Sequence, residues 1–186
     1  MSFYTEDELL AFGFKSVGKN VRLSRKASIY NAANISLGNN VRIDDFVVMS
    51  AGIGGIELGD YIHIAVYSSL IGAGKIVLGD YANVSSKVAI YSSNDDYSGE
   101  WMTNPTVPSE LTNVTHADVV IGKHVIIGCG SVVLPGVALH EGAAVGALSL
   151  VNRDCESFGI YSGVPVKQIK KRKKNLLQLE KNLRVT

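Results

Sequence analysis

The sequence contains little cysteine, no excess of charge of one sign and no long apolar run. Its two cysteines, Cys129 and Cys155, form no disulfide framework and no metal-ligand set, which is typical of a reducing compartment. Lys and Arg number 18 against 17 Asp and Glu, so no net field would recruit nucleic acid or an anionic membrane. The composition therefore argues against strongly basic binding proteins and disulfide scaffolds.

The beginning of the chain also lacks a targeting signal. Residues 1–14 read MSFYTEDELLAFGF, without the basic region and the apolar core of a signal peptide, and no apolar stretch is long enough to cross a bilayer. We therefore expect a cytoplasmic protein without a membrane span. With 186 residues, 46% of them hydrophobic, the chain has the size and apolar content of one compact domain.

An aliphatic residue recurs at every sixth position in the second half of the chain. This period fits neither a strand, which repeats every two residues, nor a helix, which repeats every three to four. The anchors are Ile121, Ile127, Val133, Leu139, Val145 and Val151. The fifth place of each unit is also restricted, and it holds Val125, Ser131, Val137, Ala143 and Ser149. Short tandem units of this kind indicate a β-solenoid, in which stacking of the units closes a continuous core.

The same period occurs upstream in shorter blocks. Five of them open alike, as VGKNVRL, LGNNVRI, LGDYIHI, LGDYANV and IGKHVII, and their glycines are Gly18, Gly38, Gly59, Gly79 and Gly122. The steps between the first four glycines are 20 or 21 residues, roughly one solenoid turn with a small corner insertion. The last step is longer because a large insertion interrupts the repeat. We therefore assign residues 17–151 to the solenoid, with an inserted loop at residues 91–118.

The ends of the chain are predicted to be helical. Thr5 and Glu8 match a capping box for a short helix that ends at Gly13, and we expect residues 1–16 to cover the first turn, whose strand edges would otherwise be open. Residues 152–186 are expected to form an extension with a basic helix. Three apolar side chains of that helix share one face: Leu176, Leu179 and Leu183.

These motifs resemble those of the hexapeptide-repeat acyltransferases, in particular the sugar O-acetyltransferases of bacterial surface polysaccharide synthesis. The resemblance is carried by residues 3–14, by IGCGSVVLPG at residues 127–136 and by SGVPVKQIKKR at residues 162–172. The last is similar to the family's G-x-P-A-K ending, with Val166 in the place of alanine. The resemblance implies a mainly β, left-handed parallel β-helix, a homotrimer, and acyl-CoA, by default acetyl-CoA, bound between neighbouring copies without a metal.

The activity implied by this resemblance is transfer of an acyl group to a hydroxyl of a sugar or nucleotide sugar, as in lipopolysaccharide or O-antigen synthesis. Two alternatives stay open. One is an N-acetyltransferase that acts on an amino-sugar nucleotide, because an amine needs less help from a base than a hydroxyl does. The other is a non-catalytic trimeric β-helix that serves as a binding module.

Small residues and a basic segment are the candidates for binding acyl-CoA. Small side chains leave space for a pantetheine arm and expose backbone groups to its amides, and Gly128, Ser131, Gly146, Ala147 and Ser149 are of this kind. The same residues would also be required by the corners of a solenoid. Cations close to the end of the coil complement the phosphates of CoA, and the candidates are Lys167, Lys170 and Arg172.

The base that takes a proton from the acceptor is the least certain part of the predicted site. The family commonly places a histidine just after the last repeat before the loop, and this sequence has none there. Asp95 or Asp96 is one candidate, with a pKa raised by the neighbouring carboxylate and by burial. The other possibility is that an aspartate orients a histidine from elsewhere, namely His63 or His116. The chain could also be an inactive relative.

Equivalent places in successive repeats predict a column of polar side chains along one side of the solenoid. The column contains Arg22, Arg42, His63 and Asn83. In a trimer it could face the loop of a neighbouring copy, which would allow a pairing of His63 with Asp95. The arginines could then receive the phosphates of a nucleotide sugar. Four residues are expected to contact the acceptor: Arg42, Asn83, Tyr97 and His116.

Metal-based chemistry is not supported by the sequence. Asp95, Asp96 and Glu100 offer hard oxygen ligands, but their spacing matches no calcium loop. His124 and His140 occupy corner places of the repeat and, with His116, do not show the arrangement of the zinc ligands in the β-helical carbonic anhydrases. We therefore expect no metal.

Overall fold

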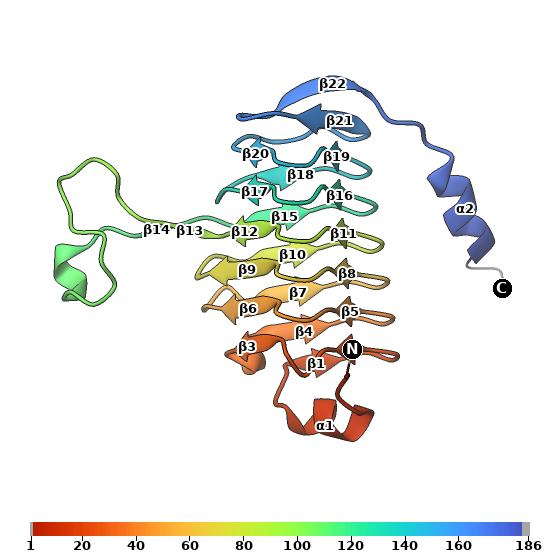
Figure 1. Cartoon of the computed structure of the whole chain (residues 1–186), viewed down its shortest axis with the longest axis horizontal. Coiled ribbons are helices and arrows are strands. Elements are labelled where there is room, and N and C mark those ends of the chain that lie inside the picture. The colour runs from red at the N-terminus through yellow and green to blue at the C-terminus, as the bar shows by residue number, and fades with distance from the viewer. Residues whose placement is uncertain (1, 184–186) are drawn as a thin grey trace.

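The computed structural model describes residues 2–183 and winds them into a parallel β-helix with three walls (Figure 1). The first wall consists of β1 (Ser16–Val17), β4 (Ile35–Leu37), β7 (Ile56–Leu58), β10 (Ile76–Leu78), β15 (Val119–Ile121) and β18 (Ala138–Leu139). The third wall consists of β3 (Ser28–Tyr30), β6 (Val48–Ala51), β9 (Ser69–Gly72), β12 (Ala89–Tyr91), β17 (Val132–Val133) and β20 (Leu150–Val151).

The second wall is the longest. It consists of β2 (Arg22–Leu23), β5 (Arg42–Ile43), β8 (His63–Ile64), β11 (Asn83–Val84), β16 (Ile126–Ile127), β19 (Ala144–Val145), β21 (Gly159–Ser162) and β22 (Lys167–Lys171). The strands of each wall pair in parallel from coil to coil, except β22, which runs antiparallel to β21. The predicted left-handed parallel β-helix is therefore confirmed, and its second wall continues past residue 151, where the six-residue period ends.

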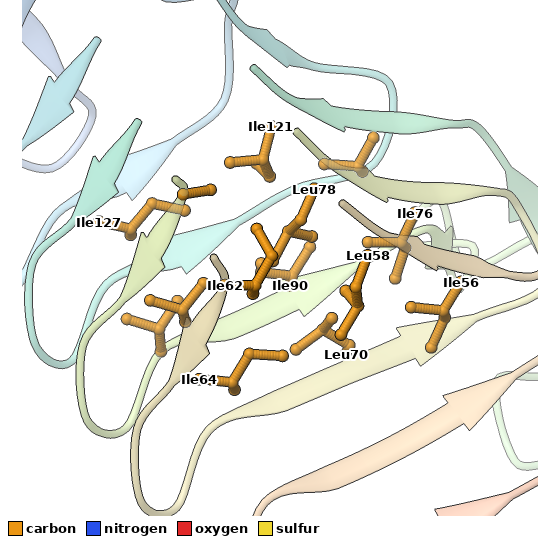
Figure 2. Packing of buried hydrophobic residues seen from close by; sticks show 14 of the residues in the cluster. Ile56, Leu58, Ile62, Ile64, Leu70, Ile76, Leu78, Ile90, Ile121 and Ile127 are labelled. Atoms are coloured by element: carbon orange, nitrogen blue, oxygen red, sulfur yellow. The ribbon is translucent and has the colours of Figure 1, made fainter. Parts of the chain in front are cut away.

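Aliphatic side chains in register form the core of the prism. Along the first wall, Leu37, Leu58, Leu78, Ile121 and Leu139 lie one above another. All five are at most 4% exposed, and Figure 2 shows three of them among the isoleucines and leucines that fill the interior. Burial of one such side chain contributes about 1.5–3 kcal/mol. The six anchors of the sequence repeat are all buried, which explains why the period is strict.

Sharp turns join the walls at three corners. The first corner joins the first wall to the second, and the second corner joins the second wall to the third. The third corner leads from the third wall to the next coil. Non-glycine residues adopt left-handed φ angles at the first corner, namely Asn20, Asn40, Tyr61, Tyr81 and His124, and at the second corner, namely Phe46, Tyr67, Lys87 and Leu148. Because each coil repeats the corner above the last, aromatic rings there stack on one another.

Short helices and a hairpin complete the chain. α1 (Glu6–Ala11) has the predicted capping box, with Thr5 as N-cap, and lies below the first coil (Figure 1), where Leu9 is buried. Two 3₁₀ turns, η1 (Ala32–Asn34) and η2 (Ser109–Leu111), occur at the third corner and in the inserted loop. The loop leaves the solenoid as an antiparallel hairpin of β13 (Ser93–Asn94) and β14 (Thr115–His116), and its tip projects away from the prism (Figure 1).

The C-terminal helix α2 (Leu176–Leu183) is attached to the first corner by a charged residue. Glu180 is 9% exposed and accepts hydrogen bonds from Lys123 at 2.7 Å and His124 at 2.8 Å. The leucine face predicted for this helix is not buried, since Leu179 and Leu183 are 60% and 48% exposed. Glu180 therefore joins the helix to the solenoid, while Leu179 and Leu183 stay exposed.

Candidate functional site

A cavity at the foot of the inserted loop brings Asp95 next to the third wall. The cavity has a volume of about 400 Å³ and is lined by Tyr91, Ser93, Asn94, Asp95, Tyr97, Val132, Leu134 and Pro135. A second hollow of about 390 Å³ continues from Asp95 and Tyr97 along the loop to Trp101. Asp95 is exposed and borders both spaces. Its carboxylate is thus accessible beside a partly apolar surface, which suits a group that exchanges a proton with a substrate.

Asp96 has a different role from the one predicted. Its carboxylate accepts hydrogen bonds from the hydroxyl and the backbone N–H of Ser98 and from the amide of Asn113, the last at 3.1 Å. The hydrogen bonds from Ser98 lower the pKa of Asp96, with a smaller contribution from Asn113. The prediction of a raised pKa is therefore wrong for Asp96, because hydrogen bonds to its carboxylate favour the ionised form. Its carboxylate joins the two sides of the loop.

His116 lies directly across the hairpin from Ser93. Its Nδ1 is 2.8 Å from the hydroxyl of Ser93, and the two residues are paired in the ladder of β13 and β14. The side chain is exposed. Asp95 follows β13 directly, two residues after Ser93, whereas His116 lies on β14 opposite Ser93. Both candidates therefore belong to the foot of the loop.

The predicted polar column exists on the outer face of the second wall. Arg22 pairs with Arg42, Arg42 with His63, and His63 with Asn83 in the parallel register. His63 Nε2 is 3.0 Å from a carboxylate oxygen of Asp44, and its Nδ1 is 3.1 Å from Asn83 Oδ1. Both ring nitrogens of His63 are therefore occupied by partners within this chain. This geometry does not support His63 as a base.

Asp44 is the residue of this column that the sequence interpretation missed. It is 5% exposed and lies at the start of the second corner. It accepts a hydrogen bond from Arg42 Nε at 2.7 Å while its other oxygen faces His63. The available signal was the spacing of Arg42 and Asp44, because residues two apart on an extended segment point to the same side.

At the lower end of this column, the first corner of the lower coils borders a wide cavity. Its volume is about 700 Å³, and it is lined by Asn20, Val21, Arg22, Asn40, Val41, Arg42 and Tyr61. The ring of Tyr61 stacks on Tyr81, with ring centroids 5.0 Å apart, and Tyr81 stacks on His124 at 4.8 Å. Basic and aromatic groups thus face one open space.

Part of the predicted acyl-CoA site is required by the solenoid itself. Ser131 is completely buried, and its hydroxyl donates to the carbonyl of Gly146 and accepts from the N–H of Ser149. A Cβ on Gly128 would come within 2.5 Å of the backbone nitrogen of Ala147 in the next coil. The assignment of Ser131 to cofactor binding is therefore not supported, because its hydroxyl is used inside the prism. Ala147 is exposed and stays accessible.

The basic residues near the end of the coil are not equivalent. The guanidinium of Arg172 donates to the carbonyls of His124 at 2.8 Å and Gly142 at 3.0 Å, and burial lowers its pKa. It therefore fastens the C-terminal segment to the first corner, and its assignment to the phosphates of CoA is not supported. Lys167 and Lys170 lie exposed on β22, where a phosphate could reach them.

Within residues 2–183, no group of three or more His, Cys, Asp or Glu side chains is arranged to hold a metal ion. No helix in that part of the chain is both long and apolar enough to cross a membrane.

Comparison with known sequences gives a close and nearly complete match. No protein-family model matches the chain. The chain is 63% identical over 180 residues to the dTDP-4-amino-4,6-dideoxy-D-glucose acyltransferase of Escherichia coli, which covers 97% of this chain and 94% of that protein. It is 31% identical over 149 residues to WbbJ of Escherichia coli, a putative lipopolysaccharide biosynthesis O-acetyl transferase, covering 77% and 72% of the two chains.

Solved structures show the same relationship. AntD, an N-acyltransferase from Bacillus cereus, matches with a TM-score of 0.93 and 47% identity in its complex with dTDP and 3-hydroxybutyryl-CoA, covering 98% of this chain and 96% of AntD. A variant of AntD bound to dTDP-4-amino-4,6-dideoxyglucose and coenzyme A matches with a TM-score of 0.94 and 46% identity over 100% of this chain and 99% of AntD.

Proposed function

The chain belongs to the hexapeptide-repeat family of sugar acyltransferases with a left-handed β-helix, and from this premise we propose that it N-acylates dTDP-4-amino-4,6-dideoxyglucose with acyl-CoA. The observation that carries the proposal is the 63% identity, over nearly the full length, to the dTDP-4-amino-4,6-dideoxy-D-glucose acyltransferase of Escherichia coli. The hydroxyl acceptor expected from the sequence is supported by more distant relatives, such as the O-acetyl transferase WbbJ. An amino-sugar nucleotide, the alternative, fits better.

An amine acceptor also accounts for the missing histidine. A hydroxyl must lose its proton as the oxygen attacks the thioester, and this requires a base poised near neutral pH. A neutral amine attacks with its own lone pair, and the proton has only to leave nitrogen after the N–C bond has begun to form. A carboxylate can accept that proton, so the loop has no need of an imidazole.

Asp95 is the residue we assign to this proton transfer. The amine nitrogen forms a bond to the carbonyl carbon of the thioester, and the C–S bond breaks. Asp95 takes the proton from nitrogen and gives it to the departing sulfur, so CoA leaves as a thiol. Crystal structures of AntD were solved with a serine or an aspartate replaced, ten positions apart in that chain. The same spacing here selects Ser85 with Asp95, or Ser86 with Asp96. Because the carboxylate of Asp96 already joins the two sides of the loop, Asp95 is preferred.

The two substrates would meet between copies of the chain. We place the pantetheine arm along Gly146 and Ala147, at the second corner, and the phosphates of CoA near Lys167 and Lys170. The acceptor sugar would enter beside Tyr97 and His116 on the loop. Arg42 and Asn83 lie on another wall, so they can reach the same acceptor only from a neighbouring copy. A homotrimer, with one site at each of its interfaces, meets this requirement.

The direct test compares an amine with a hydroxyl acceptor. The purified chain is mixed with acetyl-CoA and either dTDP-4-amino-4,6-dideoxyglucose or dTDP-glucose, and both release of the CoA thiol and the mass of the nucleotide sugar are followed. We expect N-acylation of the amino sugar only. Transfer to the hydroxyl sugar alone would restore the O-acyltransferase assignment, and consumption of neither would favour a binding module.

Replacement of Asp95 tests the assigned base. Asp95→Asn keeps the size of the side chain and removes the proton acceptor, so kcat should fall by about 10²–10⁴, with little change in the KM for acyl-CoA. Glu110→Gln, a change of an exposed acid at the loop tip, is the matched control and should keep wild-type kcat. Equal kcat values for Asp95→Asn and wild type would refute the role of Asp95.

A further inference from the structure

The cavity at the first corner of the lower coils has the features of a nucleotide site, although it lies away from the loop. It measures about 700 Å³, and its polar lining consists of Asn20, Arg22, Asn40, Arg42 and Tyr61. Two guanidinium groups and one aromatic face therefore border the same space. A nucleoside diphosphate presents the complementary groups, namely a planar base and adjacent anionic phosphates.

The two arginines are placed where like charges repel each other. Arg22 and Arg42 are direct partners in the parallel pairing of β2 and β5. Neighbouring strands lie about 4.8 Å apart, and like charges opposite each other destabilise a sheet. Arg42 is held by Asp44, whereas no ion pair within residues 2–183 involves the side chain of Arg22. Such local unfavourable placement is expected at functional positions, and here an anion would relieve it.

Asp44 fixes one of these charges in position. The carboxylate is buried and accepts from Arg42 Nε at 2.7 Å, while its other oxygen is 3.0 Å from His63 Nε2. A guanidinium whose orientation is set before binding loses less conformational entropy when it meets a phosphate. Arg42 is thus oriented in advance on the wall that borders the cavity.

Tyr61 ends an aromatic stack at the upper edge of the same cavity. One face of its ring stacks on Tyr81, with an angle of 11° between the ring planes. The corresponding place one coil below is Asn40, which is not aromatic, so the stack stops at Tyr61. Tyr61 is 43% exposed and lines the cavity. A flat nucleobase would continue the stack by one more ring.

We propose that this cavity binds the nucleoside diphosphate part of the acceptor, with thymine stacked on Tyr61 and the diphosphate on Arg22 and Arg42. The inference rests on the proposed function and deepens it, because it assigns recognition to the nucleoside diphosphate at this cavity and reaction to the sugar amine near Asp95. β12 is the strand that precedes the loop, and β5 lies two coils below it. At the spacing of parallel strands, two coils correspond to about 10 Å along the prism axis. A diphosphate and a sugar ring span such a distance, so Asp95 of a second copy can reach the amine.

Binding of dTDP alone, without CoA, tests this site independently of catalysis. The affinity of the full chain for dTDP is measured by titration calorimetry. Arg22→Ala removes a charge-assisted contact to phosphate, and we expect an affinity loss of about tenfold to a hundredfold. Arg153→Ala removes an exposed arginine at the other end of the solenoid and serves as the matched control, with unchanged affinity.

A second set of variants tests the stacking of the base. Tyr61→Leu should weaken dTDP binding by about fivefold to a hundredfold, since stacking on an aromatic side chain contributes roughly 1–3 kcal/mol per base. Tyr61→Phe keeps the ring and should bind as wild type does. Phe46→Leu disrupts the equivalent stack at the second corner, where Phe46 lies on Tyr67 with ring centroids 4.9 Å apart, and should leave dTDP binding intact.

The outcomes distinguish this inference from the proposed function. If Arg22→Ala and Tyr61→Leu bind dTDP as tightly as wild type, the inferred site is wrong, even if the enzyme N-acylates the amino sugar. If the wild-type protein binds dTDP but transfers no acyl group, and both variants lose dTDP binding, the site stands and the proposed reaction fails. In an active enzyme, Arg22→Ala should raise the KM for the sugar nucleotide while kcat and the KM for acyl-CoA stay constant.

Discussion

At the scale of the residue, the close spacing of the coils limits which side chains can serve a ligand. Ser131 and Gly128 have the small size that a cofactor groove would need, yet both are required where one coil rests on the next. Asp96 and Arg172 carry charges suited to chemistry, yet their hydrogen bonds hold the loop and the C-terminal segment. Asp95, Ala147 and Lys167, by contrast, are exposed and stay accessible to a substrate.

Gly128→Ala should destabilise the solenoid. The new Cβ would lie 2.5 Å from the backbone nitrogen of Ala147, and a backbone atom of a packed coil cannot move aside cheaply. Overpacking of this kind costs about 1–3 kcal/mol, so the midpoint of thermal unfolding should fall by several degrees. Thr103→Ala, a change at an exposed position of the loop that touches no neighbouring coil, is the comparison. Equal unfolding midpoints for the two variants would contradict the packing argument.

The two cysteines should differ in reactivity. Cys155 is buried, and burial raises the pKa of its thiol to about 11, whereas Cys129 is exposed. The thiolate is the reactive form, so at pH 8 a thiol reagent should modify Cys129 quickly and Cys155 only after unfolding. Counting modified thiols in the native and in the denatured protein by mass spectrometry checks this. Rapid modification of both thiols in the native protein would contradict the buried position of Cys155.

At the scale of the element, the inserted loop is held in shape by contacts of its own. The hairpin of β13 and β14 starts it, and Asp96 connects Ser98 with Asn113 farther out. The sequence identified this segment, because it departs from the six-residue period and carries the only tryptophan. Its internal bracing could not be predicted, since hydrogen bonds within an irregular loop depend on backbone geometry that composition does not determine.

The order of the loop should depend on pH through Asp96. Its pKa is lowered in the folded chain, so the ionised form stabilises the loop at every pH above the ordinary value for an aspartate, and the contribution is lost as pH falls through the lowered value. Hydrogen exchange of the backbone amide of Ser98, corrected for the intrinsic rate, should therefore accelerate as pH falls through the lowered pKa of Asp96. In Asp96→Asn it should be faster than in wild type at pH 6. Equal protection in both proteins would show that Asp96 does not brace the loop.

At the scale of the whole molecule, the fold was predictable and the site only in part. The fold is repeated in each coil, so Ile121, Ile127 and the other anchors report it many times over. The site occurs once, and it combines residues from separate elements. The column from Arg22 to Asn83 was predictable because it follows the repeat, whereas Asp44 and Glu180 were missed. For Glu180 the sequence offered no signal, since its partners Lys123 and His124 lie more than 50 residues away.

If the acceptor site is shared between copies, two defective variants should complement each other. Asp95→Asn lacks the proposed base, and Arg22→Ala lacks a diphosphate contact, but each keeps what the other has lost. An intact site takes Asp95 from one copy and Arg22 from its neighbour. When the two variants assemble at random into mixed trimers, about a quarter of the sites contain both residues. Co-expressed variants, assayed at a low concentration of sugar nucleotide, should therefore be more active than either variant alone. Activity no higher than the mean of the two separate variants, in assemblies proven by mass spectrometry to be mixed, would place both residues in the site of a single copy.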